Sequence, residues 1–221
     1  MEQRSPEWFK ARLGIPTASN FEKIITKAGS PSDQAHSYMS KLICERIFKR
    51  SFQEQLDVKW VRHGRKYEDE AVKQFEHATG FRTSPVGFVT SGCRRWGCSP
   101  DRLIDAKTAL EVKCPSPWRQ LEYLMYGPGN NYKQQVQGQM LVGGYEKVYF
   151  FSYFPGMPFV IVETERDNKF IKSMEAILSE FSKTLDEETK KIEIFYTIWP
   201  NVSEYMKARL VIDEVMPEAE A

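Results

Sequence analysis

The sequence predicts an α/β fold in which helices cover a central mixed β-sheet. Several segments place apolar residues with the period of an amphipathic helix and polar residues between them. Other segments are short and rich in aromatic and β-branched residues, which favour strands. Residues 109–113 alternate apolar and charged side chains with the two-residue period of a strand. Helical and strand segments that follow one another along one chain are typical of this class.

Length and composition fit one folded domain. The chain has 221 residues, of which 41% are hydrophobic and 28% are charged, and this suffices for one core. We assign residues 1–192 to a single domain and residues 193–221 to a C-terminal extension that packs on the body or on a neighbouring subunit. The start of the chain has no apolar signal-peptide core, and no apolar run reaches the roughly 18 residues of a membrane span. These features predict a cytoplasmic protein with no membrane partner.

The first eighty residues are predicted to be mainly helical. Thr17 and Ser19 are suitable cap residues, because their hydroxyls can accept hydrogen bonds from the free amides at a helix start. In the helix near residue 42, Leu42 belongs to the predicted buried stripe and Glu45 to the exposed face. The predicted segments are a short helix with a turn at residues 5–19, and helices at residues 20–27, 37–50 and 64–79.

The remainder of the domain is predicted to hold the sheet. Pro115 and Pro117 favour a helix start, because proline is well tolerated in the first helical turn. Asp167 is a suitable cap for the last helix. The strands are expected at residues 82–90, 94–104, 108–114, 145–154 and 159–166, and the helices at residues 115–126, 132–142 and from residue 167 onward.

Two acidic side chains are predicted to face each other on the hairpin of the second and third strands. If the turn centres near Ala106, Asp101 lies opposite Glu111, and Ser99 lies opposite Lys113. Directly opposed carboxylates have Cβ atoms roughly 4.5–5.5 Å apart and repel each other. A divalent cation with oxygen ligands, Mg²⁺ or Mn²⁺, would relieve this repulsion. An ordinary surface hairpin with its polar residues in solvent fits the same pattern.

Positive charge is concentrated in one part of a nearly neutral chain. The net charge is +1, yet residues 41–66 contain eight basic and three acidic residues. A local basic face on a neutral body suits a groove that touches phosphates, although a solvated helix and loop fit equally well. Arg12, near the hydroxyls of Thr17 and Ser19 at a helix start, has the composition of a phosphate pocket. An ordinary cap beside a surface ion pair is the alternative there.

Motifs around the acidic hairpin resemble those of a known family. Pro100-Asp101, a spacer of nine residues and then Glu111-Val112-Lys113 resemble the signature of the PD-(D/E)xK nuclease superfamily. The fuller segments Ser-Pro-Asp and Leu-Glu-Val-Lys-Cys-Pro, with the segments at residues 12–19, 64–71 and 132–137, are similar to the YqaJ-type viral recombinase (bacteriophage lambda exonuclease) family. The resemblance covers about residues 5–185, and the motifs follow the order of that family.

The resemblance implies a PD-(D/E)xK nuclease fold and assigns roles to particular residues. Asp101 and Glu111, with the Val112 carbonyl, are expected to hold one or two Mg²⁺ ions, with Mn²⁺ as the alternative. Lys113 is expected to orient the attacking water and to help deprotonate it. The further expected residues are Glu68 and Gln135 at the catalytic centre, and Arg12, Ser19, Ser99 and Arg119 as contacts to DNA or to its 5′-phosphate.

The resemblance also implies an activity and partners. The expected activity is a processive 5′→3′ exonuclease on linear double-stranded DNA that starts at a 5′-phosphate and leaves a 3′ overhang for recombination. The expected partners are a single-strand annealing protein and two further copies in a homotrimeric ring, and a phage or prophage origin is expected. Two alternatives remain: an endonuclease of restriction or repair type, and a DNA-binding structural protein without catalysis. The complete set Asp101, Glu111 and Lys113 disfavours the last.

Overall fold

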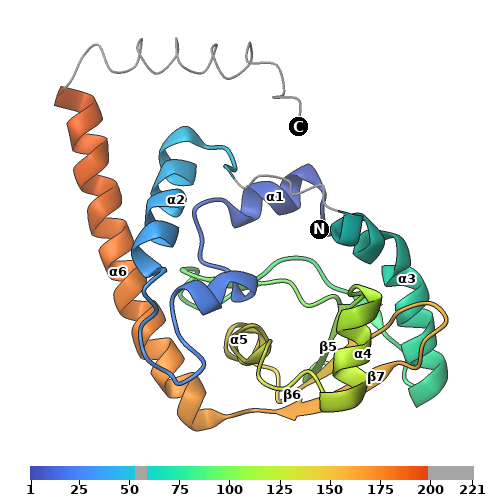
Figure 1. Cartoon of the computed structure of the whole chain (residues 1–221). Coiled ribbons are helices and arrows are strands. Elements are labelled where there is room, and N and C mark those ends of the chain that lie inside the picture. Colours follow the sequence, from blue (N-terminus) through green and yellow to red (C-terminus); the bar gives the residue numbers. More distant parts are fainter. Residues whose placement is uncertain (53–58, 199–221) are drawn as a thin grey trace.

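The computed structural model describes residues 1–52 and 59–198 (Figure 1). Its helices are α1 (Pro6–Arg12), the 3₁₀ helix η1 (Ala18–Lys23), α2 (Ala35–Phe48), α3 (Lys59–Thr79), α4 (Pro117–Tyr126), α5 (Lys133–Gly143) and α6 (Asn168–Ile198). Its strands are β1 (Ser84–Pro85), β2 (Val89–Thr90), β3 (Gly97–Cys98), β4 (Arg102–Leu103), β5 (Thr108–Lys113), β6 (Lys147–Ser152) and β7 (Val160–Glu165). The predicted α/β class is confirmed.

The described residues form a mixed sheet of five strands in the order β1-β4-β5-β6-β7. Strands β5 and β6 are parallel, from Thr108 opposite Lys147 to Lys113 opposite Ser152, and the other neighbours are antiparallel. The interior residues of β5, 109–112, are all buried, as expected for a strand at the centre of a covered sheet. Strand β5 therefore places one arm of the acidic hairpin at the centre of the sheet.

Helices cover both faces of this sheet. On one face, Phe75 of α3 packs in a cluster with Leu110 of β5 and Phe151 of β6. On the opposite face, Met140 of α5 packs in a cluster with Ala109 of β5. Because side chains alternate across a strand, Glu111 lies on the same face as Ala109, which is the face that α5 covers. A third cluster joins η1, α2 and α6 beside the sheet (Figure 1).

The strands before the acidic hairpin are shorter than predicted. The expected strands at residues 82–90 and 94–104 are each divided in two, since β1 pairs with β4 whereas β2 pairs with β3. At Gly97 in β3, a Cβ atom would lie 2.1 Å from the ring of Phe88, the residue before β2. The Gly97 amide also donates to the Pro16 carbonyl at 3.0 Å, which ties β3 to the segment before η1 instead of to the sheet.

The prediction that Glu45 faces solvent is wrong. Glu45 is buried, and its Oε2 accepts a hydrogen bond from the Gly14 amide at 2.9 Å. This contact joins α2 to the turn after α1, so it lies beyond what the helical period of α2 alone can indicate. The Asp167 cap is confirmed, because its Oδ1 accepts a hydrogen bond from the Phe170 amide at 2.9 Å.

Helix α6 continues through residue 193 to Ile198. The division into a domain at residues 1–192 and an extension at residues 193–221 stays a prediction, and most of that extension lies outside the described residues. In the part of the chain that the structure describes, every helix is too short or too polar to cross a membrane.

Candidate active site

The predicted register of the acidic hairpin is confirmed for the residues of β4, because Arg102 lies opposite Leu110 and Leu103 lies opposite Ala109. Asp101 comes one residue before β4, and the same register carried one step further sets it against Glu111. The Asp101 amide donates to the Leu110 carbonyl at 3.1 Å. The Val112 amide donates to Asp101 Oδ2 at 2.6 Å, so the carboxylate takes the place of a backbone acceptor. Strand β5 thus fixes both the position of Asp101 and the orientation of its side chain.

Glu111 is buried and held by hydrogen-bond donors on both carboxylate oxygens. Its exposed fraction is 2%. Among the described residues, Lys113 Nζ and Gln135 Nε2 contact Oε1, the latter at 2.6 Å. Gln139 Nε2 donates to Oε2 at 2.5 Å. Gln135 and Gln139 are one turn apart on α5, so a single helix face holds both oxygens.

The charges of the hairpin perturb one another. Burial, followed by repulsion from Glu111, raises the pKa of Asp101 well above its usual range. Burial alone would lower the pKa of Lys113, but attraction by Glu111 and Asp101 outweighs it and raises that pKa. Without a bound cation, the site therefore disfavours ionisation of Asp101 and favours the charged form of Lys113. This is the electrostatic state of a site with too little positive charge near two acids.

The donor set fits a hard divalent cation that keeps several waters. Asp101 and Glu111 offer carboxylate oxygens, and Val112, which follows Glu111 on β5, offers a backbone carbonyl. Within residues 1–52 and 59–198, no group of three or more His, Cys, Asp or Glu side chains is close enough to hold a metal ion. Mg²⁺ is commonly held by one or two carboxylates, with waters and substrate phosphates completing its ligands, so two acids suffice.

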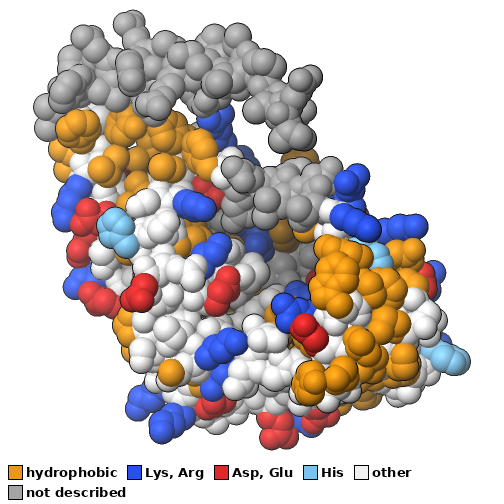
Figure 2. Space-filling view, viewed as in Figure 1, with side chains coloured by type: hydrophobic (Ala, Val, Ile, Leu, Met, Phe, Trp, Pro, Cys, Tyr) orange, Lys and Arg blue, Asp and Glu red, His pale blue; other side chains and the backbone are white. Residues whose placement is uncertain are grey.

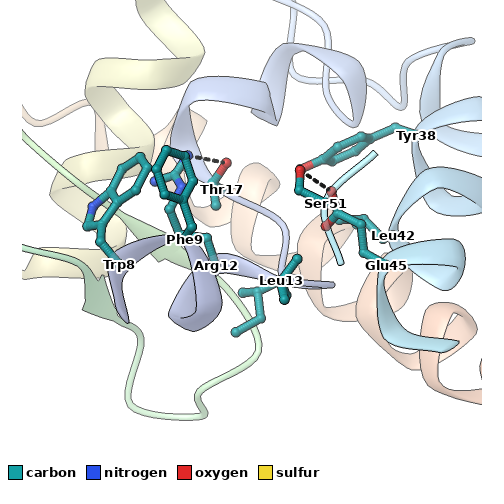
Figure 3. A pocket seen from close by; sticks show the side chains of 10 residues that line it. Trp8, Phe9, Arg12, Leu13, Thr17, Tyr38, Leu42, Glu45 and Ser51 are labelled. Carbon is teal, nitrogen blue, oxygen red and sulfur yellow. Dashed lines mark hydrogen bonds between the residues drawn. The ribbon is translucent and has the colours of Figure 1, made fainter. Parts of the chain in front are cut away.

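A second cluster brings Arg12 together with three hydroxyls. Arg12 NH1 lies 3.3 Å from Ser99 Oγ, and its NH2 lies 3.5 Å from both Thr17 Oγ1 and Ser19 Oγ. Trp8 is beneath the guanidinium, whose carbon is 4.1 Å from the ring centroid, and Trp8 Nε1 also donates to Ser99 at 3.0 Å. Figure 3 shows Arg12 beside Trp8, Phe9 and Thr17 in one pocket.

Burial lowers the pKa of Arg12, although a guanidinium remains charged at any physiological pH. The cluster is therefore a partly desolvated cation surrounded by hydroxyl groups, which is suited to an anion with several oxygens. Ser99 is two residues before Asp101 in the chain, so this cluster adjoins the acidic hairpin. The structure thus brings together Arg12, Ser19 and Ser99 as the resemblance implies.

Two predicted site residues have other partners. Glu68 Oε2 pairs with Arg4 NH2 at 2.5 Å, although its charge still contributes to the raised pKa of Asp101. Arg119 pairs with Glu122 at 2.7 Å on the exposed side of α4 and has no described contact with the Arg12 cluster. Gln139 is not among the predicted site residues, although it lies one turn from Gln135 on α5 and contacts Glu111.

Three comparisons with known proteins bear on this arrangement. Residues 7–146, more than half of the chain, match the family model of the YqaJ-like viral recombinase domain. The structure is similar to an alkaline exonuclease (LHK-Exo) from Laribacter hongkongensis, with a TM-score of 0.79 and 29% identity over 87% of this chain and 98% of that chain. The same values hold for LHK-Exo in complex with dAMP.

A more distant likeness concerns the fold alone. The structure of a phage-related exonuclease from Haemophilus somnus 129PT has a TM-score of 0.65 and 17% identity, over 80% of this chain and 96% of that chain. No curated protein sequence matches the chain.

Proposed function

The chain belongs to the family of YqaJ-like viral recombinase domains, and from this premise we propose that it is a metal-dependent exonuclease acting on double-stranded DNA. One observation carries the proposal: the opposed acids Asp101 and Glu111, with Lys113, adjoin the Arg12 hydroxyl cluster through Ser99. Metal-dependent hydrolysis of a phosphodiester needs a cation site at the scissile phosphate. An exonuclease also needs a second site that recognises a chain end. The two neighbouring clusters meet both needs.

The acidic pair would hold Mg²⁺ or Mn²⁺, with the Val112 carbonyl as a further ligand. One or two such ions would lower the pKa of an attacking water and stabilise the charge that develops on the phosphate. Gln135 keeps Glu111 in place through its hydrogen bond at 2.6 Å. Glu68, released from Arg4, would add a third acid at the edge of this centre.

Lys113 would position the attacking water. Its raised pKa keeps the ammonium group charged while the two acids are near. One N–H contacts Glu111, which leaves two donors for other oxygens. A charged Lys113 can orient a water and stabilise the hydroxide as it forms. Lys113 can accept the proton itself only after its own pKa falls. Positive charge bound near Asp101 and Glu111 would lower that pKa.

The Arg12 cluster would bind a terminal 5′-phosphate. Arg12 with Ser19, Thr17 and Ser99 offers charge-assisted donors in one place. Recognition of a 5′ end next to the cation site implies digestion from 5′ to 3′, which leaves a 3′ overhang for recombination. The structural relative was solved with dAMP, and such digestion releases mononucleotides of this kind.

Digestion of linear duplex DNA labelled separately at its 5′ and 3′ ends tests the proposal. Early release of the 5′ label as a mononucleotide, with the 3′ label retained on long strands, is the expected result in Mg²⁺. Early release of the 3′ label would contradict the polarity. A closed circular duplex should survive the same treatment, and its cleavage would instead indicate an endonuclease of restriction or repair type.

The finer family properties complete the proposal. We expect a homotrimeric ring around the substrate, a single-strand annealing protein as the partner, and a cytoplasmic site of action in the host of a phage or prophage. A closed ring would make digestion processive, since DNA cannot leave through an open side. Sedimentation should give about three times the 25.7 kDa mass of the chain. A monomer that dissociates after each cleavage would contradict the ring.

A further inference from the structure

Helix α4 turns an apolar face toward solvent. Gln120 and Tyr123 form its buried side. Trp118, Leu121 and Met125, which are spaced by three and four residues, form the opposite side and are 59%, 50% and 58% exposed. Figure 2 shows the hydrophobic side chains gathered in this part of the surface, beside a hollow. Exposed apolar groups gathered in this way mark an interaction site.

The start of α3 places aromatic and basic side chains beside this face. The rings of Trp60 and Trp118 meet edge to face with centroids 5.0 Å apart. Lys59 Nζ lies 5.0 Å from the centre of the Trp60 ring. Residues 59–66 contain four basic residues and no acidic one. We call Trp60, Trp118 and the basic residues of the segment 59–66 the aromatic–basic surface.

The aromatic–basic surface begins where the catalytic strand ends. Trp118 follows Lys113 by five residues, across the short connection between β5 and α4. Gly64 of α3 faces the Cys114 carbonyl, which would lie 3.9 Å from a Cβ atom at that glycine. Both helices of the surface are thus anchored at the end of β5 that carries Glu111 and Lys113.

We propose that the aromatic–basic surface binds an unpaired DNA strand next to the active site, namely the strand that digestion leaves behind. Exposed aromatic rings stack on bases whose faces are free, and neighbouring cations bind the phosphates between those bases. Paired bases inside a duplex hide their faces, so a duplex would use the cations and leave Trp118 without a partner. Four like charges disfavour a second copy of the same surface as the occupant. The inference rests on the proposed nuclease function and adds a strand-specific binding site to it.

The test measures DNA binding by the full chain in EDTA, so that no cleavage occurs. The probes are a fluorescent oligothymidylate and a dumbbell duplex whose two ends are closed by hairpins. Trp118→Ala should weaken oligothymidylate binding about tenfold, since stacking of one base on an aromatic ring commonly contributes this much. Binding of the dumbbell should not change. Trp118→Tyr keeps a ring and should restore most of the affinity for the single strand.

Met125→Ala is the matched control, because Met125 is equally exposed on α4 but has no ring and lies outside the aromatic–basic surface. It should leave both affinities unchanged. Unchanged single-strand binding in Trp118→Ala would overturn the proposal, and so would an equal loss for both probes. A Trp118→Ala chain that sediments as a smaller assembly would also overturn it, by showing a contact between copies. Digestion by the wild type is measured separately in Mg²⁺, so failure of the nuclease proposal and failure of this one give different results.

Discussion

Gln139 donates a hydrogen bond to Glu111 Oε2 across 2.5 Å, from a position on α5 that is only 1% exposed. The amide oxygen of Gln139 is also buried, and it has no hydrogen-bond partner among the described residues. A buried polar atom without a partner costs free energy, so the Gln139 side chain lowers the stability of the fold. In the proposed function Glu111 holds a metal ion, and the hydrogen bond from Gln139 would fix that carboxylate in place, which makes a better ligand than a mobile one.

Gln139→Leu should therefore impair the metal site more than the fold. Leucine has a similar volume but no donor, so Glu111 Oε2 loses its buried partner. Loss of such an outer contact commonly costs about 10- to 100-fold in metal affinity or activity. We expect a comparable rise in the Mg²⁺ concentration that gives half-maximal digestion, and weaker binding of Mn²⁺ measured by calorimetry without DNA.

Gln137→Leu is the control for this variant. Gln137 is buried on the same helix, donates to the Glu165 carbonyl at 2.8 Å and accepts from the Asp167 amide at 2.9 Å. Its loss should lower the melting temperature and leave the dependence on Mg²⁺ unchanged. The same Mg²⁺ shift in both variants would show that Gln139 acts through general stability alone.

Asp101→Asn should stabilise the protein without metal as the pH rises. The raised pKa of Asp101 means that folding favours its protonated form. That contribution is fully present below the unfolded pKa of about 3.9 and is lost as the pH climbs through the raised folded value. Asparagine cannot ionise and can still accept the Val112 amide, so it avoids this loss.

Urea unfolding in EDTA from pH 4 to 8 measures the difference. The free energy of unfolding of the asparagine variant should increase relative to that of the wild type as the pH rises across this range. Added Mg²⁺ should stabilise the wild type alone, and the variant should lack nuclease activity. A wild type that loses no stability relative to the variant as the pH rises would contradict the repulsion between Asp101 and Glu111.

Gly138→Ala tests the contact between α5 and η1. A Cβ atom at Gly138 would lie 2.5 Å from Cδ2 of the fully buried Phe21 and 3.3 Å from Cβ of Ala18. Overpacking of this kind costs about 1–3 kcal/mol, which exceeds the helix propensity that alanine gains over glycine. The melting temperature should fall by several degrees. Gly92→Ala, which has open space within 4 Å, should leave it unchanged, and Phe21→Leu should partly rescue the first variant.

The acidic hairpin could be predicted because its geometry is local. The two-residue period of residues 109–113 and a turn near Ala106 suffice to place Asp101 opposite Glu111. The roles of neighbours from other elements could not be read in this way. Gln139 has the sequence context of a solvated helix residue, and only the docking of α5 on the sheet turns its amide toward Glu111.

Long-range contacts also explain the errors in the fold. Glu45 is buried because an amide 31 residues earlier needs an acceptor. The strand expected at residues 94–104 is divided because β3 contacts β2, whereas β4 contacts β1 and β5. Neither contact changes the local pattern of apolar and polar residues, which is the only signal that periodicity reads.

Arg12→Ala should discriminate between DNA ends. If Arg12 binds a terminal 5′-phosphate, the variant loses a charge-assisted hydrogen bond, which is worth about 1.5–3 kcal/mol. Digestion of 5′-phosphorylated duplex at low substrate should then slow by about one to two orders of magnitude. Digestion of 5′-hydroxyl duplex should slow much less, because the wild type makes no such contact there.

Lys10→Ala removes an exposed positive charge from the same helix and serves as the control, with both substrates affected alike. An equal loss on both ends in Arg12→Ala would show that Arg12 supports the fold of the cluster, through Trp8 and Ser99, and does not read the phosphate.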